Sequence, residues 1–173
     1  MKNIIYILFL FVFISCDTSN DKPYVQQYID LSGSAFEMLF KVNQLRTNSG
    51  LNKLQGETKL MELAQDKADD MNHNHYIDHR GFYDRQVASG CAELGECLSY
   101  NYNSVESSFI AWESSKMHYL TLLKKHSTGF GYGENGKYRC ILIANYVFGK
   151  KQSVYKEVTE TTSQGTISVM VQQ

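Results

Sequence analysis

The segment that most constrains the fold lies late in the chain, from Tyr138 to Phe148. Apolar residues occupy both alternating faces of this stretch, so a strand formed here is buried on both sides. Such a strand needs one layer of structure above the sheet and another below it. Gly129 to Gly133 predicts a preceding strand, and the intervening Glu134-Asn135-Gly136-Lys137 is typical of a hairpin. The sequence therefore predicts an antiparallel sheet enclosed between two layers.

Helical periodicity supplies the material for those layers. Apolar residues at three- and four-residue spacing predict one helix that begins at Ala35 with Ser34 as its cap. Two further helices are predicted over Thr58 to Met71 and Ser104 to Leu123, and a short one over Tyr83 to Ser89. The predicted fold class is therefore α/β, an α-β-α sandwich with a small antiparallel sheet between helices.

The N-terminus has the pattern of an export signal. Lys2 gives a positive start, and Ile4 to Ile14 is an unbroken apolar run, shorter than the about 20 residues that a membrane-spanning helix needs. The run ends in Phe13-Ile14-Ser15-Cys16, which resembles a bacterial lipobox, where the cysteine becomes the acylated first residue. We therefore predict lipidation at Cys16. An ordinary cleaved signal with an incidental cysteine is the alternative, and an uncleaved membrane helix fits less well because polar residues begin at Asp17.

The sequence divides into four parts. Residues 1–15 form the predicted lipoprotein signal peptide and residues 16–34 a polar tether. Residues 35–150 form one domain of ordinary size, and residues 151–173 a C-terminal extension, either an additional β-hairpin or a loose tail. We expect the exported domain to be held by lipid at the outer membrane, at the cell surface or in the periplasm.

Charge argues against one class of partner. The chain has 17 basic and 18 acidic residues and a formal net charge of −1. Without a basic patch or stripe, it lacks the electrostatic footprint of a nucleic-acid-binding protein. The expected partners are the membrane, through the anchor, and a small lipid-like ligand or a protein.

Predicted export also bears on the cysteines. With Cys16 acylated, Cys91, Cys97 and Cys140 remain, and an oxidising compartment permits a disulfide. Cys91 and Cys97 are the pair closest in sequence and therefore the favoured pair, although geometry decides. Cys140 lies within a predicted strand and is expected to be a buried apolar residue.

Five short motifs follow one another through the predicted domain. They are Asn43-Gln44-Leu45-Arg46, Ile77-Asp78-His79-Arg80-Gly81-Phe82, Gly95-Glu96-Cys97-Leu98, Trp112-Glu113-Ser114-Ser115-Lys116-Met117-His118 and Gly129-Phe130-Gly131-Tyr132-Gly133. Their order and spacing resemble the bacterial branch of the SCP/CAP superfamily, the relatives of cysteine-rich secretory proteins and plant pathogenesis-related proteins. The resemblance runs from about Phe36 to Gly149 and implies an α/β/α sandwich with a cleft.

The resemblance also implies a set of cleft residues. In the family, two histidines and acidic residues converge in the cleft and bind a divalent metal in some members; the matching positions here are His79, His118 and Glu96. Neutral imidazoles and a carboxylate suit zinc, so these three are the predicted metal ligands, although no cofactor is required. The second acidic position of many animal members is Ser115 here, which weakens that expectation. The alternative is a buried polar network that fixes loops onto the sheet.

Three functions stay open at this point. The first is a binding module of the cell envelope, whose cleft takes a small apolar or lipid-like ligand or a protein partner. The second is a hydrolase of envelope or host material, either metal-dependent or built on Ser115, His118 and Glu96. A serine in mid-helix lacks the strained elbow of such enzymes, and no oxyanion loop is evident, so catalysis is disfavoured. The third is a structural envelope lipoprotein.

Overall fold

Strand β4 (Tyr138–Asn145) lies inside the sheet and is buried along its whole length, as its two-sided apolar pattern predicts. In the computed structural model, which describes residues 29–146 and 155–172, β4 pairs with β3 (Gly129–Asn135) across a two-residue turn and with β2 (Glu93–Tyr100) on its other side. The strands are ordered β1-β3-β4-β2-β6-β5, which places the short β1 (Gln55–Gly56) at one edge. The remaining two strands are β5 (Tyr155–Thr161) and β6 (Thr166–Gln172).

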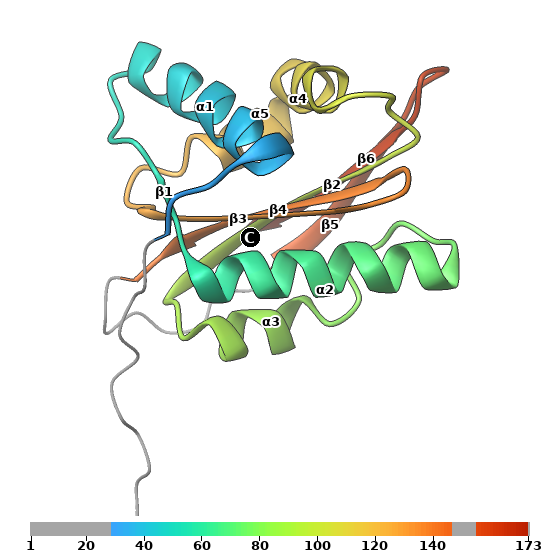
Figure 1. Ribbon diagram of the computed structural model, residues 1–173, viewed down its shortest axis with the longest axis horizontal. Coiled ribbons are helices and arrows are strands. Elements are labelled where there is room, and N and C mark those ends of the chain that lie inside the picture. Colours follow the sequence, from blue (N-terminus) through green and yellow to red (C-terminus); the bar gives the residue numbers. More distant parts are fainter. Residues whose placement is uncertain (1–28, 147–154, 173) are drawn as a thin grey trace, which may run out of the picture.

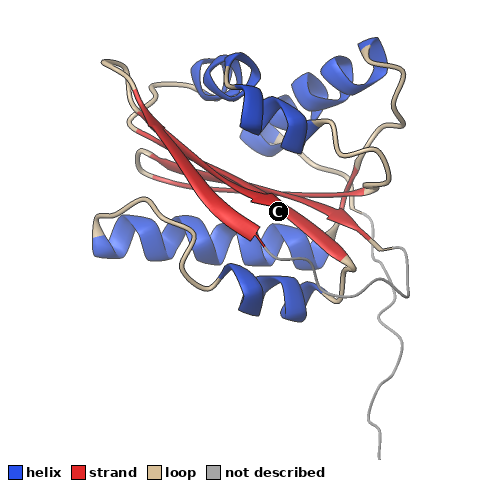
Figure 2. Cartoon of the chain, turned by 180° about the vertical axis from the view of Figure 1, so that it is seen from behind, coloured by secondary structure: helices blue, strands red, loops and turns tan. Residues whose placement is uncertain are grey.

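Helices cover both faces of this sheet (Figure 1), and the view from behind shows the same two helical layers (Figure 2). One layer holds α1 (Gly33–Asn48), α4 (Val105–Ser114) and α5 (Lys116–Leu122). The other holds α2 (Thr58–Asn74) and α3 (Phe82–Ser89). The predicted α-β-α sandwich is confirmed. The sheet is larger than expected, however, and it is mixed, because β1 and β3 are parallel.

Each face of the sheet has its own core. Ile141 and Ile143 of β4 pack in a cluster with Trp112 of α4, beneath α1 and α4. Leu142 and its alternate neighbours on β4 pack in a second cluster with α2 and α3, which includes Phe82. The two-residue period of the strand therefore fills both interfaces of the sandwich.

Two motif residues hold the first helix onto the rest of the domain. The buried Arg46 guanidinium donates to four backbone oxygens, those of Asn52, Leu122, Lys124 and Ser127. Asn43 both donates to the Leu54 carbonyl and accepts from the Leu54 amide, at 2.9 and 2.7 Å. Both residues therefore have a structural role, since they join α1 to backbone groups of later segments.

Local details differ from the sequence-based expectations at three places. The helix expected over 104–123 is broken at Ser115, whose backbone is extended with φ −91° and ψ 121°. Helix α1 begins at Gly33, so Ser34 lies inside it, and the N-cap is Ser32. The Gly95-Glu96 motif lies on a buried central strand, β2, that helical and hairpin patterns did not predict.

The favoured Cys91–Cys97 disulfide is wrong in this structure, where both thiols are free and buried. Cys97 packs in the cluster beneath α1 and α4, whereas Cys91 packs in the cluster on the opposite face of the sheet. Proximity in sequence misleads here because Cys91 precedes β2, in the segment that follows α3, and packs on the α2–α3 side, whereas Cys97 lies within β2 and faces α1 and α4. Cys140 is fully buried within β4, as expected.

The C-terminal segment is an integral part of the sheet. Strands β5 and β6 form a hairpin, and β6 pairs with β2 from Cys97↔Val169 to Tyr100↔Thr166. Ile167 and Val169 complete the cluster beneath α4. Among the described residues, no helix is long and apolar enough to span a bilayer. The predicted signal peptide and Cys16 lie outside the described residues.

Candidate functional site

Two of the predicted site residues meet in a buried ion cluster. His79, in the loop between α2 and α3, places its Nδ1 atom 2.6 Å from Oε1 of Glu96 on β2. Arg85 of α3 donates to both oxygens of the same carboxylate, through Nε at 2.6 Å and Nη2 at 2.8 Å. Glu96 is fully buried and His79 is 5% exposed. The cluster therefore joins β2, α3 and the loop after α2 at one point.

The charge on Glu96 is stabilised by these neighbours. Burial alone would raise its pKa, but the Arg85 charge and the hydrogen bonds from His79 and Arg85 lower it to about 2. Because a carboxylate only accepts hydrogen bonds, His79 donates through Nδ1. Its other ring nitrogen, Nε2, is buried and has no hydrogen-bond partner among the residues that the structure describes.

The other two predicted residues meet at the junction between α4 and α5. Ser115 separates the two helices, and its backbone carbonyl accepts from the amide of Tyr119 at 2.8 Å. Its hydroxyl lies 2.8 Å from Nδ1 of His118 and donates to Oε1 of Glu160 at 2.5 Å. Glu160 comes from β5 in the C-terminal hairpin, so the hairpin supplies a carboxylate beside Ser115.

This chain of contacts fixes the protonation of His118. A serine hydroxyl has one proton, and here that proton is donated to Glu160. Nδ1 of His118 must then be the donor toward Ser115, which leaves a lone pair on Nε2. By hydrogen-bond geometry, that atom has no partner among the residues that the structure describes.

Burial keeps His118 neutral. It lowers the pKa of His118 to about 4, although the Ser168 backbone and the Glu160 charge act in the opposite direction, and His79 lowers the value further.

The predicted zinc set does not fit this arrangement. His79, His118 and Glu96 were the expected ligands, but Arg85 and His79 already occupy both Glu96 oxygens. Among the residues that the structure describes, no group of three His, Cys, Asp or Glu side chains is placed to hold a metal. Two imidazole nitrogens fall short of the three protein ligands of catalytic zinc sites.

The arrangement also differs from a Ser-His-acid triad. In such a triad the histidine accepts the serine proton and the acid holds the opposite ring nitrogen. Here Ser115 lies between the histidine and the acid, and it donates to Glu160 rather than to His118. Glu96, the acid expected for the triad, binds His79 instead. Ser115 does stand at a helix junction rather than in mid-helix, which corrects the expected position.

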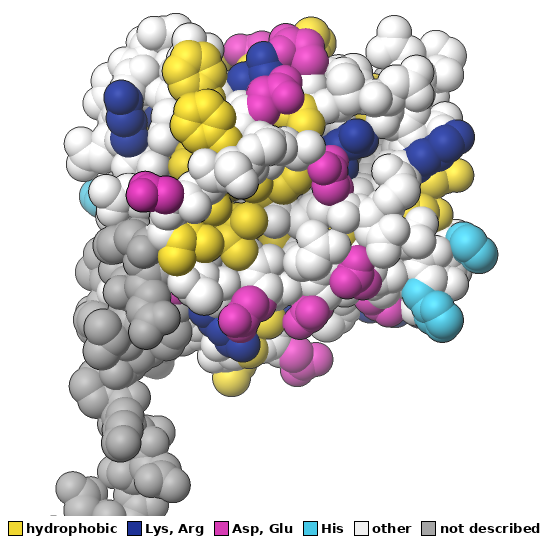
Figure 3. Space-filling model, viewed as in Figure 1, with side chains coloured by type: hydrophobic (Ala, Val, Ile, Leu, Met, Phe, Trp, Pro, Cys, Tyr) yellow, Lys and Arg dark blue, Asp and Glu magenta, His cyan; other side chains and the backbone are white. Residues whose placement is uncertain are grey.

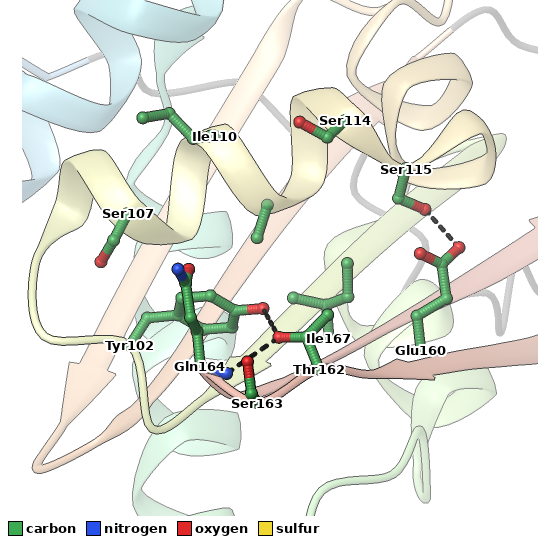
Figure 4. A pocket seen from close by; sticks show the side chains of 11 residues that line it. Tyr102, Ser107, Ile110, Ser114, Ser115, Glu160, Thr162, Ser163, Gln164 and Ile167 are labelled. Atoms are coloured by element: carbon green, nitrogen blue, oxygen red, sulfur yellow. Dashed lines mark hydrogen bonds between the residues drawn. The ribbon is translucent and has the colours of Figure 1, made fainter.

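An open groove runs between α4 and the C-terminal hairpin, and Ser115 and Glu160 lie at one end of it (Figure 4). Its volume is about 560 Å³. Tyr102 ties its floor to the hairpin turn through a 3.3 Å contact between its hydroxyl and that of Thr162. The side chains that line the groove are Tyr102, Ser107, Ile110, Ala111, Ser114, Ser115, Glu160, Thr162, Ser163, Gln164 and Ile167.

Sequence reasoning missed two participants, Arg85 and Glu160. A buried carboxylate such as Glu96 requires a cation, but no sequence spacing identifies Arg85 as that cation. Glu160 lies in a segment that was expected to be a hairpin or a loose tail, and only the pairing of β6 with β2 brings it to Ser115. Of the predicted residues, the structure brings His79 to Glu96 and Ser115 to His118 in two separate clusters.

Comparison with known sequences identifies a protein family that matches most of the described domain. Residues 39–146 match the sequence profile of CAP, the cysteine-rich secretory protein family. One curated relative is the uncharacterized membrane protein YlbC of Bacillus subtilis (strain 168), 28% identical over 109 residues. That match covers 59% of this chain and 32% of YlbC, so the chain spans about a third of the relative's length.

Solved structures of other bacterial proteins have a similar fold. An extracellular protein containing a SCP domain from Bacillus anthracis superposes with a TM-score of 0.62 at 22% identity, over 65% of this chain and 40% of that one. An outer surface protein of Borrelia burgdorferi superposes with a TM-score of 0.61 at 18% identity, over 71% of this chain and 100% of that one. The family profile covers more than half of the sequence, and the chain therefore belongs to the cysteine-rich secretory protein (CAP) family.

Proposed function

We propose that this protein is an exported, lipid-anchored binding module that takes a small amphipathic ligand in the groove between α4 and the C-terminal hairpin. The observation that carries the proposal is the composition of that groove. Apolar side chains of Ile110, Ala111 and Ile167 lie along it, and hydroxyl groups and one carboxylate lie around them. Its volume, about 560 Å³, is within the usual range of small-molecule sites.

Charge narrows the class of ligand. Glu160 is the one charged side chain among the described residues that line the groove. One of its oxygens accepts from Ser115, and the carboxylate stands at the end of the groove (Figure 4). An anionic head group placed there would be repelled. The groove thus favours a ligand with an apolar body and a hydroxyl or amine head.

The proposed export rests on the sequence and on the relatives. Lys2, the apolar run Ile4 to Ile14 and Cys16 have the order of a lipoprotein signal. Two structurally similar proteins are described as an extracellular protein and an outer surface protein. Labelling cells with an alkyne fatty acid tests the anchor: the wild-type chain should take up label in the membrane fraction, and a Cys16→Ser variant should not. Equal labelling of both chains would refute acylation at Cys16.

Calorimetric titration with three ligands of equal chain length tests the groove. Decanol and decylamine should bind saturably, and decanoate should bind more weakly because of Glu160. Glu160→Gln should reduce the preference for decylamine over decanoate by about tenfold, since each 1.4 kcal/mol of lost attraction is a factor of ten.

A matched pair of variants tests whether the ligand binds in the groove. Ile110 lines the groove and is 49% exposed, whereas Leu120 on α5 is 53% exposed and is not among the lining residues. Ile110→Ser should weaken decanol binding and Leu120→Ser should leave it unchanged. Equal effects of the two substitutions, or no saturable binding by wild-type protein, would reject the groove as the ligand site.

A further inference from the structure

Large apolar side chains are exposed where the described chain begins. Ile29, Phe36 and Phe40 are 41%, 56% and 52% exposed. We call these three apolar residues the aromatic patch, after its two phenylalanine rings. The rings of Phe36 and Phe40 lie one helical turn apart on α1 and stack with centroids 6.3 Å apart. Figure 3 shows hydrophobic side chains gathered over α1 and the neighbouring end of the sheet.

A shallow groove continues the patch toward the sheet. It has a volume of about 500 Å³ and lies between the start of α1 and β1. Its apolar lining includes Leu31, Leu39 and Leu54 together with Ile29 and Phe36. The exposed apolar surface is therefore contiguous rather than a scatter of single side chains, and surfaces of this kind mark interaction sites.

The chain enters the domain at this surface. The Ile29 amide donates to the Gly56 carbonyl at 2.9 Å, which fixes the entry point at the β1 edge. A side chain at Gly56 would come within 2.8 Å of Leu31, so residues 29–31 lie directly against β1. Whatever is attached to the preceding residues is consequently tethered from a point beside the aromatic patch.

We propose that the aromatic patch contacts the lipid surface to which Cys16 is anchored. This inference rests on the proposed lipidation of Cys16. Twelve residues separate Cys16 from Ile29, and an extended chain of that length reaches at most roughly 45 Å. The attachment point lies within the patch itself, so the short connection raises the local concentration of lipid at this face over the opposite one. Aromatic side chains on the exposed face of a helix are suited to the boundary between head groups and acyl chains.

Two exposed carboxylates, Asp30 and Glu37, lie beside the patch, so lipid contact has to leave both of them in the aqueous head-group region. Lys41, one position beyond Phe40, is paired with Glu106 of α4, which limits the number of uncompensated charges beside the patch. The α4–hairpin groove is lined by other residues, so a patch seated on lipid and an open ligand groove are compatible.

Tryptophan quenching tests the contact in the full-length, lipidated chain. The chain's one native tryptophan, Trp112, is fully buried and serves as an internal reference. Phe40→Trp places a reporter in the patch, and Val87→Trp places the control on α3 in the opposite layer, where Val87 is 70% exposed. Each protein is incorporated into phosphatidylethanolamine–phosphatidylglycerol vesicles with brominated acyl chains. The Phe40→Trp protein should show blue-shifted emission and a loss of intensity, and the Val87→Trp protein should show neither.

Each remaining outcome contradicts the inference in a recognisable way. If the chain sediments with vesicles but the Phe40→Trp protein is not quenched, the anchor stands and the patch does not touch lipid. If the chain does not sediment, the proposed anchor fails and the inference fails with it. If emission is blue-shifted without quenching and light scattering gives a dimer mass, the patch joins two copies of the chain. Unchanged melting temperatures of both variants exclude misfolding.

Discussion

At the scale of single residues, the fold keeps one buried side chain charged and another buried side chain neutral. Arg85 and His79 hold Glu96 ionised in the layer with α3, and burial holds His118 neutral beneath α5. Replacing one partner of such a buried pair commonly costs about 3 to 5 kcal/mol, because the other charge is left without compensation. These residues therefore contribute to the stability of the fold whether or not a ligand is bound.

His118 should make stability depend on pH in a defined range. Its pKa falls from 6.5 in the unfolded chain to about 4 in the folded protein. Below pH 6.5 the unfolded state binds a proton that the folded state does not, so the free energy of unfolding falls as the pH falls. Between pH 6.5 and pH 4.5 the loss attributable to His118 should be roughly 2 to 3 kcal/mol.

Urea unfolding of the wild type and of His118→Gln across this range measures the effect. Glutamine does not titrate, so the difference between the two proteins should have a slope between pH 6.5 and pH 4.5 and none above pH 7. Below pH 4.5 both proteins should lose stability for a second reason. The pKa of Glu96 is about 2 in the folded protein, so the unfolded chain binds a proton at this carboxylate more readily than the folded protein does. Parallel curves throughout would show that His118 titrates normally in the folded state.

At the scale of elements, the sequence predicts those whose pattern is local. Helix α2, the β3–β4 hairpin and the two-sided burial of β4 follow from periodicity and turn residues. The break at Ser115 does not, because the flanking apolar residues continue the helical period across it. Strand β2 carries Glu96 and Gly95 between apolar residues and so lacks the alternation of a half-buried strand.

The candidate site was predictable only in part, because its geometry depends on contacts between elements that are far apart in sequence. Family motifs identify His79, Glu96, Ser115 and His118, which the structure sorts into two clusters. The partners that determine their protonation come from elements whose placement is decided by tertiary pairing. Glu160 reaches Ser115 only because β6 extends the sheet at β2.

The packing of α2 on β3 depends on two glycines. A Cβ atom at Gly131 would lie 2.2 Å from the Leu60 carbonyl oxygen, and one at Gly133 would lie 2.3 Å from that of Ala64. These contacts are with helix backbone, which cannot rotate away. Gly131→Ala and Gly133→Ala should each lower the free energy of unfolding by about 1 to 3 kcal/mol or more.

Gly129 on the same strand provides the matched control. A Cβ atom there would meet the Leu60 side chain at 2.9 Å, and a side chain can adjust where a helix backbone cannot. Gly129→Ala should therefore cost less than either of the other substitutions in urea unfolding. An equal loss for all three alanine variants would mean that strand propensity, rather than the approach of α2, sets the effect.

At the scale of the whole molecule, the C-terminal hairpin extends the family domain. The family profile ends at residue 146, and the hairpin at residues 155–172 adds two strands, core residues beneath α4 and one wall of the proposed ligand groove. The domain thus gains stability and a candidate site from the same addition. The sheet itself separates the cysteines, with Cys97 on one face and Cys91 and Cys140 on the other.

A Cys16→Ser variant should therefore fold without any disulfide. Burial raises the pKa of the Cys91 thiol to about 11 and raises those of Cys97 and Cys140 as well, so all three should react slowly with a thiol reagent in the native protein. After denaturation without reductant, all three should react, and a reducing agent should leave the melting temperature unchanged. Recovery of a single thiol, together with a lower melting temperature under reduction, would establish a disulfide and contradict the three free thiols of this structure.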